Sequence, residues 1–543
     1  MSRTLRASPL ACAVLAVGLP WLAGCTNAPQ ARPVPAEPVR GGVLRMVQEA
    51  PQTLDPWRSA SVYDSLPISQ IFDTLVAYDP SLNVVPRLAE TWTISRDSRE
   101  YTFFLRPAVR FHNGDPLTAN DVVYSISRQL MPNHAGISLA FSYLMTIDGA
   151  PEYSRGQTDH VRGLEIVDAR TVKFRLARPY PSFLELLAME NLAVVPERVV
   201  RQVGTFEFGR KPVGTGPFSL ADWDDDGITL AANRDHFHGA PYLDGVRIAF
   251  LRPDENDYGA ARFLDSQLDV LEPPTESLDL LAVDDSVTLH RYQELSVSFL
   301  GLNTEVAPLD DRSVRRAIAH ALNRQAMVDD SPSVRREAVG ILPPGLPGYS
   351  PEPKALDYNP ERARRLLAQA GYPEGRGLPV IPLHTASQSK AAIRLLRQVE
   401  SDLGAVGIRL DVVPVSWSEL GAHLDEGTAG AFLLAWIADL TDPDSFLRSM
   451  FEPDGSGNYF GHLSDETNQL LEAGIREFDP VARARIYRRL EAQILQEAPL
   501  VPLYHSIGVI AVRDHVEGFH PTPLGVAKVE LERVWIRPAD APS

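Results

Sequence analysis

The two cysteines of this 543-residue chain limit what can hold its fold together. Cys12 lies within an apolar N-terminal run and Cys25 follows shortly after it. The rest of the chain therefore has no disulfide, no thiol nucleophile and no thiolate metal site. A body of this length can bury a large core and is long enough for two to four domains at ~100–200 residues each.

The N-terminal segment has the pattern of a lipoprotein signal peptide. Two arginines precede an apolar run at 10–19, and the small residues Ala23 and Gly24 lead into Cys25. A transmembrane anchor is the alternative, but the run is far shorter than the ~20 residues that a spanning helix needs, and prolines flank it. We therefore expect residues 1–24 to be removed. A lipid on Cys25 would then hold the protein to a membrane on the periplasmic side of the cell envelope.

The segment after the signal peptide is expected to be an extended tether. Residues 25–40 contain four prolines and few core-forming side chains, and folded sequence begins near Gly41. The formal charge of −18 becomes −20 without the leader, which carries two arginines and no acid. So acidic a surface argues against nucleic acid as a partner and against membrane contact beyond the lipid itself.

Strand and helix signals alternate along the body. Residues 101–106 alternate in polarity as a strand does, and Thr118 with Asp121 has the spacing of a capping box at the start of a helix. Strands are also predicted at 408–415 and 431–436, the second apolar throughout and therefore central in its sheet. This order predicts a mixed α/β protein with more than one lobe.

Two later helices have clear start signals. Asn359 precedes Pro360 in one, which Gly371 closes, and Asp479 precedes Pro480 in the other. In the second helix we expect a buried stripe of Ile486, Leu490 and Ile494. Its arginines are expected largely on solvated faces, namely Arg483, Arg485, Arg488 and Arg489.

Three glycine- or histidine-containing segments are predicted to be turns. Gly214-Thr215-Gly216 suits a tight backbone path, since it lacks the lysine of a phosphate-binding loop, and 224–227 suits a solvated hairpin turn. Residues 236–238 place two histidines two positions apart, which could hold nickel or copper on a strand. A surface turn is the preferred interpretation of this segment.

The order of motifs over residues 41–537 resembles the family 5 extracellular solute-binding proteins of ABC importers, which includes oligopeptide-, dipeptide- and nickel-binding proteins. Eight segments carry the resemblance in the family's order: TLDP at 53–56, PRLAETW at 86–92, YTFFLRPAVRFHNGDPLTANDVVYS at 101–125, PVGTGPF at 212–218, LNTEVAPLDDRSVRRAIAHALNR at 302–324, NPERARRLLAQAGYP at 359–373, WIADLTDPDSF at 436–446 and PLVPLY at 499–504.

The resemblance implies an α/β fold of the periplasmic-binding-protein class II (cluster C) type, with three lobes and a ligand cleft between lobes I and III. Strands that cross between lobes would act as hinges, so that closure buries the solute. The expected boundaries are 41–78, 184–272 and 497–537 for lobe I, 79–183 for lobe II, 273–496 for lobe III and 538–543 for a C-terminal tail.

The resemblance also implies a ligand-binding residue. In the peptide-binding relatives, the aspartate three residues after a tryptophan holds the α-ammonium group of the ligand, and Asp439 after Trp436 matches this position. An ammonium enclosed without a partner carries a desolvation cost of several kcal/mol, so a carboxylate is needed there. Trp436 is the second candidate, as a flat wall or a cation–π contact. The alternatives are ordinary core packing for Trp436 and a turn or helix-capping acid for Asp439.

Two neighbouring acids offer a possible calcium site, which the spacing disfavours. Asp439, Asp442 and Asp444 do not follow the 1, 3, 5 pattern of an EF-hand loop, and position 450 is methionine where a glutamate is required. We interpret Asp442-Pro443-Asp444 as a turn that leads into a helix, and we expect no metal.

These observations favour a binding protein over an enzyme. The sequence contains no Gly-x-Ser-x-Gly elbow, no His-Glu-x-x-His helix and no Walker-type loop. We expect a monomeric lipoprotein without cofactor or catalysis, which passes a peptide or similar amine-bearing solute to an inner-membrane ABC permease. Leu433, Leu434 and the arginine-free loop 422–430 depart from the oligopeptide-binding pattern, so a different solute, including a metal chelate, stays an alternative. A signalling or chaperone lipoprotein that keeps the fold is another.

Overall fold

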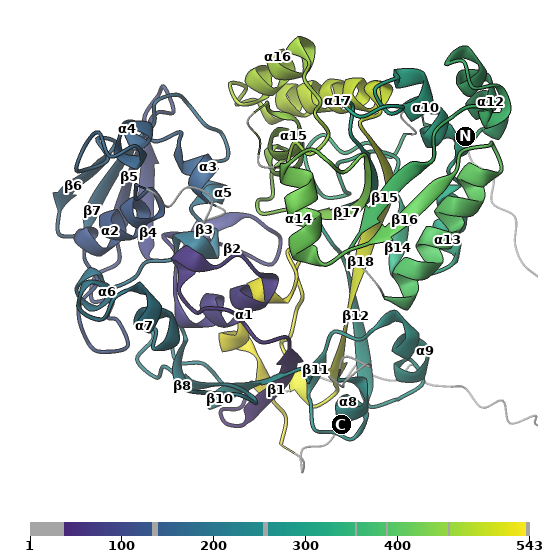
Figure 1. The fold of residues 1–543 in the computed structure, drawn as a ribbon. Helices are drawn as coiled ribbons and strands as arrows, with labels where there is room; N and C mark the ends of the chain where they lie inside the picture. The colour runs from purple at the N-terminus through teal and green to yellow at the C-terminus, as the bar shows by residue number, and fades with distance from the viewer. Residues whose placement is uncertain are drawn as a thin grey trace, which may run out of the picture.

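The computed structural model describes residues 37–132, 140–252, 259–352, 356–386, 389–453, 455 and 457–538. The predicted signal peptide, Cys25 and most of the tether lie outside these residues. Figure 1 shows two groups of elements, purple to blue on one side and green on the other, joined below by strands that run between them. We keep the names lobe I, lobe II and lobe III for the ranges given above, whose boundaries stay a prediction.

Lobe I contains a four-stranded sheet that distant parts of the chain build together. Its order is β1-β10-β9-β8, and Val43 pairs in parallel with Gly245. Its core also takes in C-terminal residues such as Leu531 and Val534. The strands are β1 Val43–Gln48, β8 Phe218–Asp224, β9 Gly227–Ala232, β10 Gly245–Phe250, β11 Val270–Leu271, β19 Val516–Glu517 and β20 Trp535–Ile536. The helices are η1 Pro56–Arg58, α1 Val62–Ile71, η2 Glu190–Leu192, α6 Glu197–Val203, α7 Thr205–Arg210, α8 Ala260–Leu264, η5 Val526–Lys528 and η6 Leu531–Arg533.

Lobe II is a second four-stranded sheet covered by short helices. Its strand order is β4-β5-β7-β6, and aromatic side chains including Phe103, Phe174 and Phe183 fill its core. A hairpin of β2 and β3 connects it to lobe I. In this hairpin, β2 Val76–Tyr78 falls at the end of the first lobe I range and β3 Val84–Pro86 in lobe II. The other elements of lobe II are β4 Ala89–Ile94, β5 Glu100–Leu105, α2 Ala119–Gln129, α3 Phe141–Leu144, α4 Ala150–Ser154, β6 Leu164–Asp168 and β7 Thr171–Arg175, and α5 Phe183–Leu186 lies at its boundary with lobe I.

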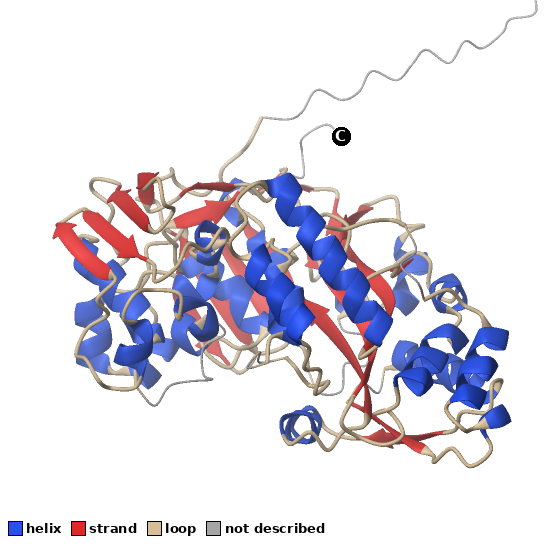
Figure 2. Ribbon diagram, turned by 90° about the horizontal axis from the view of Figure 1, so that it is seen from above, coloured by secondary structure: helices blue, strands red, loops and turns tan. Residues whose placement is uncertain are grey.

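Lobe III carries the largest sheet, with helices packed against it (Figure 2). The order is β11-β18-β13-β17-β15-β16, with β12 and β14 also paired to β18. The strands from the lobe III range are β12 Val287–Gln293, β13 Ser296–Leu302, β14 Arg335–Glu337, β15 Ile381–Thr385, β16 Leu410–Pro414 and β17 Ala431–Ile437. The sheet also contains β11 and β18 Leu500–Arg513, which fall in the lobe I ranges. The helices are η3 Thr275–Ser277, α9 Leu278–Leu281, α10 Arg312–Ala321, α11 Arg324–Asp329, α12 Pro360–Gln369, η4 Pro373–Gly375, α13 Lys390–Gly404, α14 Trp417–Asp425, α15 Asp444–Phe451, α16 Asp465–Gly474 and α17 Pro480–Glu497.

The long strand β18 crosses between the two groups of elements. Its first half pairs with β13, and its second half pairs with β12 and β11 (Figure 1). A strand shared in this way gives the connection few degrees of freedom, which suits hinge motion rather than free tumbling. Among the described helices, none is long and apolar enough to cross a membrane.

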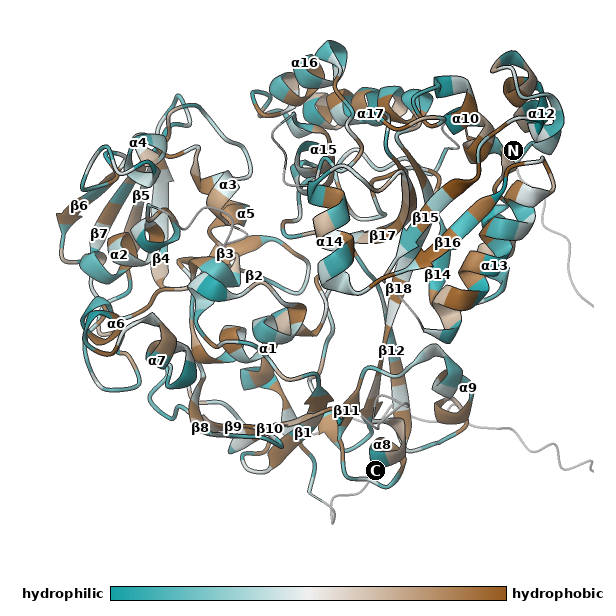
Figure 3. Cartoon of the chain, viewed as in Figure 1, coloured by the Kyte–Doolittle hydropathy of each residue, from teal (hydrophilic) through white to brown (hydrophobic). Residues whose placement is uncertain are grey.

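The predicted strands and helix starts are confirmed. Thr118 and Asp121 form the capping box of α2, while the Asn359 side chain accepts from the Arg362 amide at the start of α12. Asp479 caps α17 in the same way, through the Ala482 amide. The amphipathic pattern of α13 is visible in Figure 3, where both hydropathy colours occur on one helix.

The glycines of the 214–216 turn are required by close backbone contacts. A Cβ at Gly214 would lie 2.0 Å from the Ile71 carbonyl oxygen, and one at Gly216 would lie 2.5 Å from the Gln70 carbonyl oxygen. The predicted tight turn is therefore confirmed, and it docks against the end of α1. The hairpin turn between β8 and β9 is confirmed as well.

The prediction of a surface turn at 236–238 is only partly right. The segment is a turn, but the side chain of His236 is fully buried, with Nε2 3.7 Å from the Asp73 carboxylate. Arg87 pairs with the same carboxylate at 2.5 Å, and His238 is exposed. The sequence pattern missed this because Asp73 and Arg87 lie far from the turn along the chain. His236 belongs to the lobe I interior.

Candidate functional site

The strand that carries the candidate residues lies inside the large sheet. β17 pairs with β13 on one side and with β15 on the other, as its apolar sequence predicts. Phe432 is fully buried near its start, and the Ala438 amide donates to the Leu295 carbonyl just beyond its end. Asp439 is therefore held at a fixed position where the strand leaves the sheet.

Trp436 lies at the edge of the lobe III core, where it is neither fully buried nor fully exposed. Its indole Nε1 donates to the Ser445 carbonyl at 2.7 Å, and its ring leaves no room for a Cβ at Gly457. The side chain is partly exposed and packs against the main core cluster. Packing thus fixes the ring, and part of the side chain is exposed.

Asp439 is partly buried, and its carboxylate has no cationic partner among the described residues. Its backbone amide donates to Ser445 Oγ at 2.8 Å, while Tyr143 Oη of lobe II donates to Asp439 Oδ2 at 3.4 Å. Burial raises the pKa of Asp439 to about 7, the nearby Glu190 carboxylate adds to the rise, and the hydrogen bond from Tyr143 opposes it. Within the described part of the chain, no lysine, arginine or histidine pairs with this carboxylate. The site therefore has an unbalanced acid.

Tyr143 connects lobe II to this end of lobe III. Its hydroxyl lies 3.1 Å from Ser449 Oγ as well as near Asp439, and burial beside that carboxylate raises its pKa far above the ordinary value. Leu440 is fully buried within the lobe II core cluster, and Thr441 Oγ1 donates to Tyr78 Oη at 3.4 Å. Lobes II and III are thus in direct contact around Asp439.

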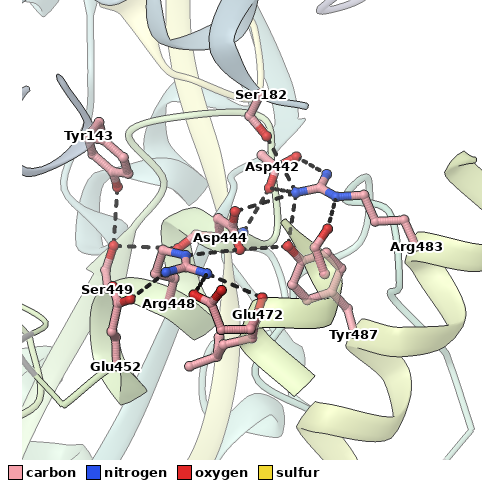
Figure 4. A network of polar contacts seen from close by, with 12 residues as sticks. Tyr143, Ser182, Asp442, Asp444, Arg448, Ser449, Glu452, Glu472, Arg483 and Tyr487 are labelled. Atoms are coloured by element: carbon pink, nitrogen blue, oxygen red, sulfur yellow. Dashed lines mark hydrogen bonds and ion pairs between the residues drawn. The ribbon is translucent and has the colours of Figure 1, made fainter. Parts of the chain in front are cut away.

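The acids Asp442 and Asp444 belong to a buried ion-pair network, shown in Figure 4. Arg483 contacts both Asp442 oxygens and lies 3.4 Å from Asp444, while Tyr487 donates to Asp444 at 2.6 Å. The predicted turn into a helix is confirmed, since Asp442 accepts from the Asp444 amide at the start of α15. Among the described residues, no group of three or more histidine, cysteine or acidic side chains has a metal-binding arrangement.

The expectation that Arg483 is solvated is wrong. Its side chain is 9% exposed and reaches Ser182 of lobe II at 3.5 Å as well as the two acids. Arg483, Tyr487, Leu490 and Ile494 follow a spacing of 4, 3 and 4 on one face of α17, and all are buried. This spacing could have revealed Arg483 as part of the stripe. Arg485, Arg488 and Arg489 are exposed as predicted, and Ile486 is only partly buried.

The wall of lobe I near Asp439 carries a second acid that the sequence did not single out. Glu190, at the start of η2, pairs with Lys528 at 2.6 Å. Both line a cavity of about 90 Å³ together with Tyr78 and Arg87. Drug-sized ligands occupy pockets of ~300–1,000 Å³, so this cavity alone could hold only a small part of a solute.

Comparison with known proteins places these features in a family. The family model described as "Bacterial extracellular solute-binding proteins, family 5 Middle" matches residues 83–458. "Di/tripeptide-binding protein 2" of Pseudomonas aeruginosa (strain UCBPP-PA14) is 29% identical over 89% of this chain and 94% of that protein. "Heme-binding protein A" of Haemophilus influenzae is 28% identical over 84% of this chain and 85% of that protein.

Solved structures show the same fold. HbpA2 from Haemophilus parasuis has a TM-score of 0.76 and 26% identity, covering 91% of this chain and 100% of that structure. The murein tripeptide binding protein MppA of Escherichia coli has a TM-score of 0.79 and 24% identity, covering 92% and 99%. These similarities confirm the mixed α/β, class II (cluster C) fold that the sequence predicts.

Proposed function

Because the chain belongs to family 5 of the bacterial extracellular solute-binding proteins, we propose that it captures peptides or similar amine-bearing solutes and delivers them to an ABC permease. Relatives with di- and tripeptide-binding names, at 29% and 30% identity, support this solute class. The protein acts as a carrier in this proposal and catalyses no reaction.

The unbalanced carboxylate of Asp439 is the observation that carries the proposal. A partly buried acid with a raised pKa and no cationic partner among the described residues destabilises the ligand-free protein. An ammonium group placed beside it would remove that cost and form a charge-assisted hydrogen bond. We assign Asp439 as the anchor for the ligand amine, with Trp436 as the adjacent wall and Tyr143 as a second hydrogen-bond partner from lobe II.

Closure follows from the same geometry. Tyr143 and Thr441 make contacts between lobe III and the rest of the molecule on both sides of Asp439, and β18 connects the lobes. A ligand bound at Asp439 would therefore be enclosed when these contacts form and released when they break. The contact regions lie next to the anchor, so binding and closure are coupled.

Heme is a second candidate solute, since a relative at 28% identity is named a heme-binding protein. Heme offers carboxylates and no ammonium, so it would leave Asp439 unpaired and would place negative charge near a negative site. The charge of the site thus favours an amine over heme.

We also propose that the mature protein is a monomer held to the membrane by a lipid on Cys25 and exposed on the periplasmic side. The basis for the lipid anchor and the periplasmic location is the signal-peptide pattern, which lies outside the described residues. Replacing Cys25 with Ser should release the protein into the soluble envelope fraction and abolish labelling by a palmitate analogue. Unchanged membrane association and labelling would refute the anchor.

The solute class is tested by native mass spectrometry on gently purified protein, followed by calorimetry with alanyl-alanine and trialanine. We expect co-purifying peptides, and we expect Asp439→Asn to weaken binding of free-amino peptides at least a hundredfold. Asp425→Asn, an exposed acid on the same lobe, is the matched control and should bind as the unmodified protein does. A bound heme or metal chelate, or equal binding by the Asp439 variant, would refute the proposal.

A further inference from the structure

Glu190 lies in lobe I, near the contact that the segment after Asp439 makes with Tyr78. Its neighbour Met189 belongs to the buried cluster that also contains Leu440, the residue after Asp439. Tyr78 lines the same cavity as Glu190 and accepts the hydrogen bond from Thr441, two residues after Asp439. The start of η2 and the end of β17 therefore lie on either side of one contact between lobes I and III.

Lys528 fixes Glu190 in its charged form. The ammonium Nζ lies 2.6 Å from Glu190 Oε2 and donates also to the Ala188 carbonyl at 3.3 Å. The side chain of Glu190 is 19% exposed and that of Lys528 is 18% exposed, so solvent screens the attraction between their charges only in part. Lys528 lowers the pKa of Glu190 to about 2 in spite of burial, while the charge of Glu190 contributes to the raised pKa of Asp439.

Asp439, Glu190 and Lys528 together carry one net negative charge in the ligand-free protein when both acids are ionised. Arg87, in the same cavity as Glu190 and Lys528, is already paired with Asp73 and Glu532. The charge of Glu190 raises the pKa of Asp439 across the contact between lobes I and III, and Lys528 compensates the charge of Glu190. A single positive group from a ligand brings the set to neutrality. Like charges across a contact oppose closure, and a cation between them favours it.

We propose that Glu190 is a second, specificity-determining acid of the amine site, which faces the ligand ammonium across the lobe contact while Lys528 acts as a positioning residue behind it. This inference rests on the proposed function and deepens it. The site selects a solute end with one net positive charge, such as a primary amine, and rejects neutral or acetylated ends.

The test compares Glu190→Gln, Lys528→Met and the double variant in calorimetry with alanyl-alanine, trialanine and their N-acetylated forms at pH 8. Glu190→Gln should weaken free-amino peptides at least fivefold and leave the acetylated forms unchanged. Lys528→Met should bind free-amino peptides as tightly as the unmodified protein or more tightly, because it leaves the site more negative. The double variant keeps the net charge of the unmodified protein but lacks the carboxylate that faces the ligand. It should therefore recover only part of the affinity lost in Glu190→Gln and stay weaker than the unmodified protein, and it guards against a misfolded single variant.

A merely structural ion pair predicts the opposite pattern. In that case, Glu190→Gln and Lys528→Met would weaken binding alike, and the double variant would bind as tightly as the unmodified protein. This pattern overturns the inference. A loss of affinity smaller than fivefold in Glu190→Gln overturns it as well. The pH profile gives an independent readout, since removing Glu190 should move the midpoint of the affinity curve to lower pH. If Asp439→Asn abolishes binding while Glu190→Gln has no effect, only this inference fails. If no free-amino peptide binds to the unmodified protein, the proposed function itself fails.

Discussion

Replacing Asp439 with Asn should stabilise the ligand-free protein while it removes binding. The pKa of Asp439 rises from 3.8 to about 7 on folding, which corresponds to about 4 kcal/mol at ~1.4 kcal/mol for each pKa unit. Asp439 is only partly buried as a residue, so solvent screening reduces the expected gain to about 2–4 kcal/mol at pH 8.

The direction depends on pH. Between about pH 4 and pH 7 the unfolded chain carries an ionised Asp439 and the folded protein a protonated one, so stability falls as pH rises through this window. The variant lacks this loss. Its advantage should therefore be absent near pH 4 and complete above about pH 7.

Thermal and urea unfolding of ligand-free protein at pH 4.5, 6 and 8 measure this effect. An unfolding entropy of ~2 cal/mol/K per residue converts the gain into a melting temperature about 2–4 °C higher at pH 8. The exposed-acid variant Asp425→Asn should show no such pH-dependent gain. A variant at Asp439 that is less stable than the parent at pH 8 would show that its carboxylate is a stabilising turn acid, and would refute the assignment.

Three further predictions follow from named contacts. Affinity for free-amino peptides should fall about tenfold for each pH unit below 7, because the amine requires ionised Asp439, and a calorimetric profile flat from pH 5 to 8 would contradict this. Arg483→Ala should lower the free energy of unfolding by ~3–5 kcal/mol, since it removes the arginine that pairs with buried Asp442 and one of the two arginines near buried Asp444. The exposed Arg485→Ala should change it by less than ~0.5 kcal/mol in urea titrations. Gly214→Ala should lower the free energy of unfolding, because its Cβ would clash with the Ile71 carbonyl. Gly421→Ala, in an open helix position, should raise the free energy of unfolding by ~0.5–1 kcal/mol. Equal melting curves for the two variants would refute the packing argument.

The local parts of the fold were predictable from the sequence. Helix caps join residues that are only three or four positions apart, so they can be found in the sequence. The structure confirms the caps at Asn359 and Asp479 and the capping box at Thr118. The burial of Arg483 was also within reach, because its spacing to Tyr487 and Leu490 places it on the apolar face of α17.

The composition of the site was not predictable in the same way. Tyr143 is 296 residues from Asp439 in the chain, and Lys528 is 338 residues from Glu190. No local period or spacing connects such pairs, since the lobes bring them together only after each has folded. The buried position of His236 was missed for the same reason, because its partner Asp73 belongs to a distant segment.

A crystal structure with bound trialanine tests the central claim most directly. We expect the peptide between lobes I and III, with its ammonium nitrogen ~2.7–2.9 Å from an Asp439 carboxylate oxygen and the Glu190 carboxylate on the opposite side. A peptide held elsewhere, or held with its amine in solvent while Asp439 contacts only protein groups, would contradict the account.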